Sequence, residues 1–383
     1  MKGAARGLAA LLFFGTLTLW VEERWAWSLF QVGIFLLAGW RLARARWKQV
    51  PVPFWPLAAA CCWPFLQVIL DRSMAPARTW DAALDWFTFL VLFALAAEVF
   101  SDQGVRRWFL RAAALFGMFV AAEATVQNYS SGGKIFWLFA SGYSEGVMGP
   151  FVNRGQYSAW IELLLPVALY LALSDQRRRV LWGSAAAVLF GSLVAGASRA
   201  GFVLAGAELV AVVAVAGVRK LFSRKTLVAA AVQIAVLAGI ATTVAGWQGL
   251  QGRLETQSSE ALRVDAVRAS AQMVREYPWF GTGLGTWPTV YPAYAGLDTG
   301  LFVNQAHNDW AQWAAEGGLP FLLLMAVFSL LCCKKAVPSI YGLGVVAFLL
   351  HGLVDYPMQQ RPVLAAWFFV VAGVSAAWSS DRT

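Results

Sequence analysis

The chain has 383 residues, of which 59% are hydrophobic and only 13% are charged. Soluble domains carry about 25% charged residues, and a soluble fold of this length could not bury so much apolar surface. The formal net charge is +9. Because the basic residues come in short clusters between apolar stretches and do not form one stripe, the charge does not indicate a nucleic-acid partner.

Apolar stretches close to the roughly 20 residues that span a bilayer recur along the chain. They predict an all-α polytopic membrane protein with about twelve transmembrane helices. Lys2 and Arg6 resemble the start of a signal peptide, but no small-residue cleavage site precedes Glu22, so the first helix is expected to be retained. The stretches are residues 7–21, 26–40, 54–70, 82–100, 108–127, 156–174, 179–197, 201–218, 226–247, 319–333, 337–353 and 363–378.

The basic clusters predict the orientation. With the N-terminus inside, a twelve-helix threading places most of them on one side, which the positive-inside rule assigns to the cytoplasm. The C-terminus then lies inside as well. The clusters are Arg41, Arg44, Arg46, Lys48, Arg106, Arg107, Arg177, Arg178, Arg179, Arg219, Lys220, Arg224, Lys225, Lys334 and Lys335.

Two long connections fall on the outer side, at residues 128–155 and 248–318. Long loops without signs of disorder are more often functional than decorative. The chain accordingly divides into four parts. They are N-terminal transmembrane helices (1–127), transmembrane helices with outer-loop motifs (128–247), a long outer loop (248–318) and C-terminal transmembrane helices (319–383).

The second outer loop contains an amphipathic helical pattern from Ser259, a plausible N-cap, to Tyr277, just before Pro278. Arg263 projects from its apolar face, whereas Arg268 lies on the polar side. A guanidinium on an apolar face needs an anion or a wet cavity, and the alternative is a side chain that snorkels to water. One apolar stripe holds Leu262, Ala266, Ala269 and Met273, its neighbour Val267, Ser270 and Val274, and the polar side Asp265, Gln272, Arg275 and Glu276.

Three glycines follow this pattern, at Gly281, Gly283 and Gly285. Their spacing is similar to that of a dinucleotide-binding turn, but no strand precedes them and Pro288 follows closely, so the context of that motif is missing. A tight loop lined by aromatic residues is the better prediction.

His307 is the first candidate for chemistry. It precedes a short helical pattern that ends at Glu316-Gly317-Gly318. The positive end of a helix dipole favours a neutral imidazole, which can act as a base. The alternative is that His307, Asn308 and Asp309 only cap the helix.

Other polar residues lie at the outer ends of the predicted helices. Arg199 occupies a short turn after Ser198 on the outer side of the membrane. The positive-inside rule disfavours an arginine there, which suggests a functional reason for it. The remaining candidates are Asn153, Arg154 and Gln156 before the sixth helix, and Asp355 after His351. All of these could instead be ordinary interfacial side chains.

No cluster of potential ligands has the spacing of a metal site, so we expect no metal and no other cofactor. The acidic pair Glu22-Glu23 in the first outer loop is the alternative metal site. The adjacent cysteine pairs, Cys61-Cys62 and Cys332-Cys333, lie in or at the end of apolar stretches and are assigned to packing.

Taken in chain order, these motifs resemble the O-antigen ligase and O-antigen polymerase superfamily of bacterial inner-membrane glycosyltransferases. The resemblance covers roughly residues 140–365, and Gly155 stands where the family often has a second asparagine. The matching segments are Gly149-Pro150-Phe151-Val152-Asn153-Arg154, Ser198-Arg199-Ala200-Gly201, Arg263 with its helix and the glycines to Gly285, Ala306-His307-Asn308-Asp309 with Glu316-Gly317-Gly318, and His351 with Asp355.

The resemblance implies a glycan donor on undecaprenyl diphosphate at the periplasmic face, an acceptor hydroxyl on a glycan or a lipid A core, inversion at the anomeric carbon and a lipopolysaccharide or polysaccharide product. Arg199 and Arg263 would then stabilise the departing diphosphate in place of a metal. His307 would take the proton of the acceptor hydroxyl, with Glu316 or Asp355 as supports. Asn153, Arg154, Gln156, Ser198 and Asn308 would bind substrate.

Two alternatives remain open at this point. A polymerase of the same superfamily would use the same donor chemistry with a second lipid-linked repeat as acceptor. A twelve-helix transporter of lipid-linked glycans would use Glu123, Glu162 and Glu208 as a proton relay. The absence of an internal repeat and the structured outer loop argue against the transporter.

Overall fold

The computed structural model describes residues 1–44, 50–143, 146–245, 260–297, 300, 302–359 and 362–377. The expected N-cap Ser259, the basic residues Arg46 and Lys48, and the ends of the expected stretches 226–247 and 363–378 lie outside the described residues. Most of the described chain is helical, with one short pair of strands. The protein is an all-α polytopic membrane protein.

Each predicted apolar stretch overlaps a helix of the structure. The elements are α1 (Lys2–Leu17), α2 (Arg24–Arg44), α3 (Phe54–Ile69), α4 (Pro76–Val99), α5 (Gln103–Ser130), β1 (Lys134–Ile135), β2 (Phe139–Ala140), α6 (Arg154–Ser174), η1 (Gln176–Arg178), α7 (Arg179–Gly196), α8 (Arg199–Val218), α9 (Arg224–Ala245), α11 (Glu260–Glu276), α12 (Trp287–Val290), η2 (Tyr291–Ala293), α13 (Asp309–Ser339), α14 (Leu343–His351) and α15 (Pro362–Ala376). Of the described segments, seven are long and apolar enough to cross a membrane: α2, α4, α5, α6, η1 with α7, α8 and α13.

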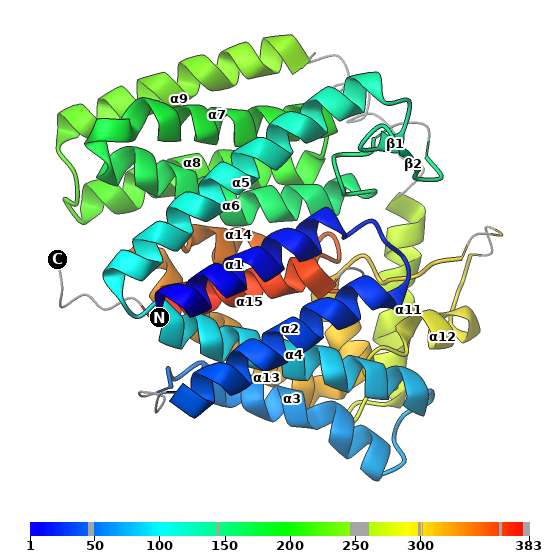
Figure 1. Cartoon of the computed structure of the whole chain (residues 1–383). Helices are drawn as coiled ribbons and strands as arrows, with labels where there is room; N and C mark the ends of the chain where they lie inside the picture. The colour runs from blue at the N-terminus through cyan, green and yellow to red at the C-terminus, as the bar shows by residue number, and fades with distance from the viewer. Residues whose placement is uncertain are drawn as a thin grey trace.

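The long helices lie side by side in a bundle, and the chain begins at the end opposite α11 and α12 (Figure 1). Buried residues run along nearly the whole of α6 and α15, so these two helices form the centre. Trp160 of α6 and Trp367 of α15 meet there edge to face, with ring centroids 6.0 Å apart. Such aromatic pairs contribute packing beyond the apolar area that they bury.

Two predicted boundaries near the C-terminus are wrong. The stretch 319–333 belongs to the longer helix α13, which begins ten residues earlier at Asp309 and continues to Ser339. The stretch 337–353 contains the last residues of α13 and then the short helix α14. The expected end of a helical pattern at Glu316-Gly317-Gly318 is visible as a kink inside α13, where Gly318 has φ +72°.

The loop with the three glycines docks onto this kink. Gly281, Gly283 and Gly285 all have positive φ, which glycine adopts without a steric penalty. Thr282 N donates to Ala315 O at 3.0 Å, and Gly283 N donates to Glu316 O at 2.9 Å. The predicted tight loop is therefore the connection that fastens the segment after α11 to α13.

Helix α11 confirms the main apolar stripe, since Ala266, Ala269 and Met273 are buried against the segment 287–306 and α13. The predicted polar side is wrong at Asp265, which is buried and accepts a hydrogen bond of 2.8 Å from the Tyr291 hydroxyl. The reason is that the chain after α12 folds back over this side of the helix. Arg263 and Arg268 are both exposed.

Candidate functional site

A cavity of about 510 Å³ lies at the end of the bundle where α6, α8 and α13 begin. We call it the arginine cavity. It brings together seven of the ten residues expected at the site, from segments far apart in the sequence. They are Asn153, Arg154, Ser198, Arg199, Arg263, His307 and Asp355, and the other lining residues include Tyr143, Phe302, Asn304 and Tyr356.

Local capping sets the helix starts that form this cavity. The Asn153 side chain accepts hydrogen bonds from Gly155 N at 2.7 Å and Gln156 N at 3.3 Å at the start of α6. Ser198 Oγ accepts from Gly201 N at 3.2 Å at the start of α8. These side chains occupy the N-cap positions and fix where the two helices begin. Since the first residues of both helices line the cavity, the positive ends of α6 and α8 point toward it.

Three guanidinium groups add to this positive potential. Arg154 and Arg199 are the first residues of α6 and α8, and Arg263 comes from α11. Arg199 is half-buried, whereas Arg154 and Arg263 are exposed. Helix N-termini and fork-shaped guanidiniums are the groups that proteins use to bind phosphate oxygens, so the cavity has the chemistry of a phosphate or diphosphate site.

One acidic residue, Asp355, also lines the cavity. Its carboxylate lies so close to the start of α6 that a side chain at Gly155 would collide with Asp355 Oδ2. The structure supplies a physical reason for a glycine at position 155. Glycine here leaves the space that the Asp355 carboxylate occupies.

Asp355 lies between the two histidines. His307 Nδ1 is 3.5 Å from Asp355 Oδ1, and His351 Nε2 is 3.9 Å from Asp355 Oδ2. On its other side His351 Nδ1 is 2.7 Å from Glu162 Oε1 of α6. His351 and Glu162 are fully buried, whereas His307 is partly exposed. Asp355 therefore has the cavity histidine on one side and the buried pair of His351 and Glu162 on the other.

The electrostatic surroundings keep Asp355 ionised. Burial raises the pKa of its carboxyl, but the contact with His307 and the nearby charges of His351 and Arg263 lower it further than burial raises it. The net result is a pKa below the ordinary aspartate value. A carboxylate that stays charged can orient an imidazole and stabilise its protonated form.

The backbone at His307 has φ +51°, a left-handed conformation that is uncommon outside glycine. Such conformations cost on the order of 1–3 kcal/mol and are found disproportionately at functional sites. His307 also packs edge to face against Tyr356, with ring centroids 4.6 Å apart. The ring is therefore held in one place beside Asp355.

Three expected site residues lie outside the lining of the arginine cavity. Gln156 is buried in the first turn of α6. Asn308 caps α13, accepting from Ala311 N at 2.9 Å and donating to Leu353 O at 2.7 Å. Glu316 accepts from Trp287 N at 2.8 Å and lines a different cavity. Chain proximity to His307 had grouped Glu316 with the site, but the helical turns of α13 carry it away.

Sequence reasoning missed Tyr143, Asn304 and Tyr356. The Tyr356 hydroxyl accepts a hydrogen bond of 3.0 Å from Asn153 Nδ2, so it links the cap of α6 to the segment after α14. Burial and then the charge of Asp355 raise the pKa of Tyr356 above its ordinary value. Its place next to Asp355 in the chain was the available signal, but interfacial tyrosines are too common to make that signal specific.

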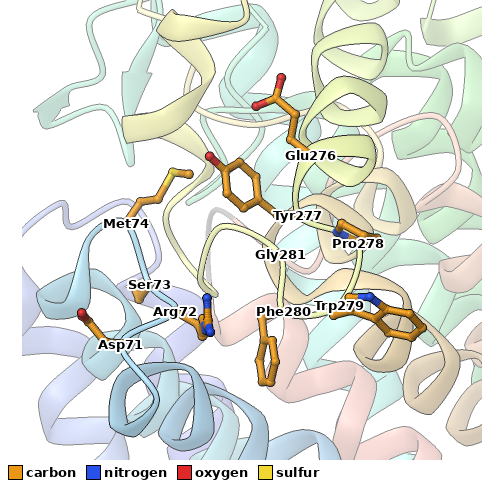
Figure 2. A pocket seen from close by; sticks show the side chains of 10 residues that line it. All are labelled: Asp71, Arg72, Ser73, Met74, Glu276, Tyr277, Pro278, Trp279, Phe280 and Gly281. Carbon is orange, nitrogen blue, oxygen red and sulfur yellow. The ribbon is translucent and has the colours of Figure 1, made fainter.

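A separate cavity of about 300 Å³ lies between the segment after α3 and the segment after α11 (Figure 2). It is lined by Tyr277, Pro278, Trp279 and Phe280 opposite Asp71–Met74. Figure 2 shows the Trp279 side chain on the side of its loop away from Met74, and this indole is largely exposed. None of the expected site residues lines this cavity. Among the described residues, no group of three His, Cys, Asp or Glu is placed to hold a metal ion.

The fold is that of a polytopic membrane protein, and a cavity lined by three arginines and a histidine lies at one end of its helix bundle. Residues 184–326 match the family described as O-antigen ligase. This match supports the resemblance of the chain to the O-antigen ligase superfamily that was drawn from the motifs. No curated protein matches the chain.

Proposed function

We propose that the protein transfers a glycan from undecaprenyl diphosphate to an acceptor hydroxyl on a glycan or a lipid A core, at the periplasmic face of the bacterial inner membrane. The observation that carries the proposal is the convergence of Arg199, Arg263 and His307 on one cavity from three distant segments. Positive groups and a base are the two components that transfer from a lipid diphosphate requires.

The diphosphate binds at the arginine side of the cavity. As the bond between the anomeric carbon and the phosphate oxygen breaks, its electron pair stays on the departing diphosphate. Arg199 and Arg263 stabilise this negative charge together with the starts of α6 and α8. Because these groups are already in place, no metal ion is needed to compensate the charge.

His307 acts on the acceptor. Its Nδ1 faces Asp355, so the neutral tautomer with the proton on Nδ1 leaves Nε2 free to accept the proton of the acceptor hydroxyl. The hydroxyl oxygen forms the new bond to the anomeric carbon from the side opposite the diphosphate, which inverts the configuration there. Asp355 then stabilises the imidazolium.

Purified protein in detergent, a lipid-diphosphate glycan donor and an acceptor glycan test the proposal. The wild type should form an acceptor-linked glycan with inverted anomeric configuration. His307→Ala should lose about 10² to 10⁴ in rate, and Arg199→Ala about 10² to 10³. Wild-type protein that binds the donor but forms no linked product would contradict the proposal.

A further inference from the structure

A second cavity, of about 270 Å³, lies on the other side of two segments that also border the arginine cavity. In the first segment, Asn304 and His307 line the arginine cavity, whereas Gln305 lines the second one. In the other, Asp355 and Tyr356 line the arginine cavity, whereas Met358 and Gln359 line the second. The same two segments therefore border both cavities, and His307 and Asp355 lie on the arginine side.

The lining of the second cavity differs from that of the arginine cavity. It combines side-chain amides, carboxylates and guanidiniums, so it offers both hydrogen-bond donors and acceptors, and neither charge sign dominates. The polar groups that matter most here are Arg78, Asp85, Gln305, Gln312, Glu316 and Gln359. A phosphate favours clustered cations and an acyl chain favours apolar walls, whereas a ligand rich in hydroxyls matches a mixed lining.

Several of these groups are held in place by the fold. Gln312 Nε2 donates to Gln305 Oε1 at 2.6 Å and to Glu316 Oε1 at 3.2 Å. Gln312 Oε1 accepts from Ala306 N at 3.0 Å, next to His307. Asp85 accepts from Trp27 Nε1 at 2.7 Å. The cavity is thus lined by side chains that are ordered before any ligand arrives, which lowers the entropic cost of binding.

One donor in the lining is unused. Trp313 is almost fully buried, and its Nε1 has no hydrogen-bond partner among the described residues. Buried indole N–H groups normally have one. Trp313 is also one of the residues that line the second cavity, so an oxygen atom of a ligand that reached this N–H would satisfy the donor.

We propose that the second cavity binds a sugar residue of the acceptor glycan, adjacent to the sugar whose hydroxyl reacts at His307. This inference rests on the proposed function. The assignment to the acceptor follows from position: the diphosphate occupies the arginine side, and the second cavity lies beyond the base that receives the acceptor's proton. The cavity has room for one sugar ring.

The test compares two acceptors, one carrying only the reacting sugar and one carrying the next sugar as well. With the longer acceptor, Gln305→Ala and Gln359→Ala should each raise the acceptor KM roughly threefold to tenfold, as loss of one neutral hydrogen bond implies. With the shorter acceptor, and for the donor KM, both variants should equal the wild type. Gln272→Ala, at an exposed position of α11, is the matched control and should change nothing.

A second pair of variants tests the role of the Trp313 indole N–H. Trp313→Phe removes the indole N–H, keeps an aromatic ring and should raise the KM for the longer acceptor only. Trp160→Phe removes another buried indole N–H without a partner, at a residue that does not line the second cavity, and should leave this KM unchanged. Equal effects on both acceptors, a changed donor KM, or unchanged kinetics in all cavity variants would overturn the inference.

Direct binding separates this inference from the proposed function. The probe is the oligosaccharide freed by mild acid from the host's own envelope glycan, titrated onto the wild type and Gln359→Ala in detergent. Weaker binding by the variant supports the second cavity even if wild-type protein transfers nothing, an outcome that would remove the proposed function alone. Equal binding by both proteins overturns the inference.

Discussion

Arg263 and Arg268 lie on the same helix and differ in what their side chains face. Arg263 lines the arginine cavity, and Arg268 does not. We expect Arg263→Ala to lose about 10² to 10³ in transfer rate, because a preorganised positive group at a developing charge contributes that much. Arg268→Ala should retain most of the activity. The comparison is made with purified proteins at equal concentration, and equal losses would contradict the assignment of Arg263.

The depressed pKa of Asp355 predicts a pH dependence of stability. An aspartate whose pKa is lowered by folding contributes stability that is fully present above the unfolded pKa, about 3.9, and is lost as the pH falls through the lower folded value. The difference in melting temperature between the wild type and Asp355→Asn in detergent should therefore not shrink between neutral pH and about 4, and should shrink only below that. A difference that already shrinks between pH 7 and 5 would mean that folding raises this pKa.

For single residues, the sequence was informative where the direction of a side chain follows from helical periodicity. The helical angle of 100° per residue separates Arg263 from Arg268. Both side chains are exposed, and of the two only Arg263 lines the arginine cavity. The contact of Asp355 with Gly155 could not be predicted, since the two residues are 200 positions apart and meet only after α6 and α14 pack together. Proximity in the chain was also misleading for Glu316, which lies nine residues after His307 but lines a different cavity.

Gly155, in the first turn of α6, leaves the space that the Asp355 carboxylate occupies. Gly155→Ala should reduce kcat by about tenfold or more, because the added methyl group would push the Asp355 carboxylate from its position beside His307. Helix propensity alone favours alanine by about 1 kcal/mol, so a weaker helix would not explain such a loss. Rates and melting temperatures of purified variants provide the measurement.

Gly206→Ala in α8 is the matched control, since an added methyl group there meets nothing within 4 Å. It should leave kcat unchanged and the melting temperature equal or slightly higher. If Gly155→Ala behaves like Gly206→Ala, then Asp355 does not depend on the space at Gly155.

Most helices could be predicted from the sequence, because a long apolar stretch has few alternatives to a membrane helix. The region from Asp309 to His351 was the exception. There Gly318 interrupts the helical backbone without ending α13, since the loop residues Pro278 and Trp279 occupy the space beside it. A packing relationship of this kind is not visible in local sequence.

The basic clusters predict the membrane topology of the whole chain. Both termini should be cytoplasmic, and the segment from α11 to the start of α13 should be periplasmic. Reporter fusions after Lys225 and after Gly300 should therefore report opposite sides of the membrane. The same side for both would refute the threading and the periplasmic location of the arginine cavity.

In the mechanism that we propose, the arginine cavity transfers the glycan without a divalent metal. The most direct measurement is the transfer rate of purified wild-type protein with its lipid-diphosphate donor and acceptor, first in excess EDTA and then after magnesium or manganese is restored. We predict equal rates in both conditions, with Arg199→Ala and Arg263→Ala strongly impaired in both. Activity that disappears in EDTA and returns with the metal would contradict the claim and direct attention to Glu22 and Glu23.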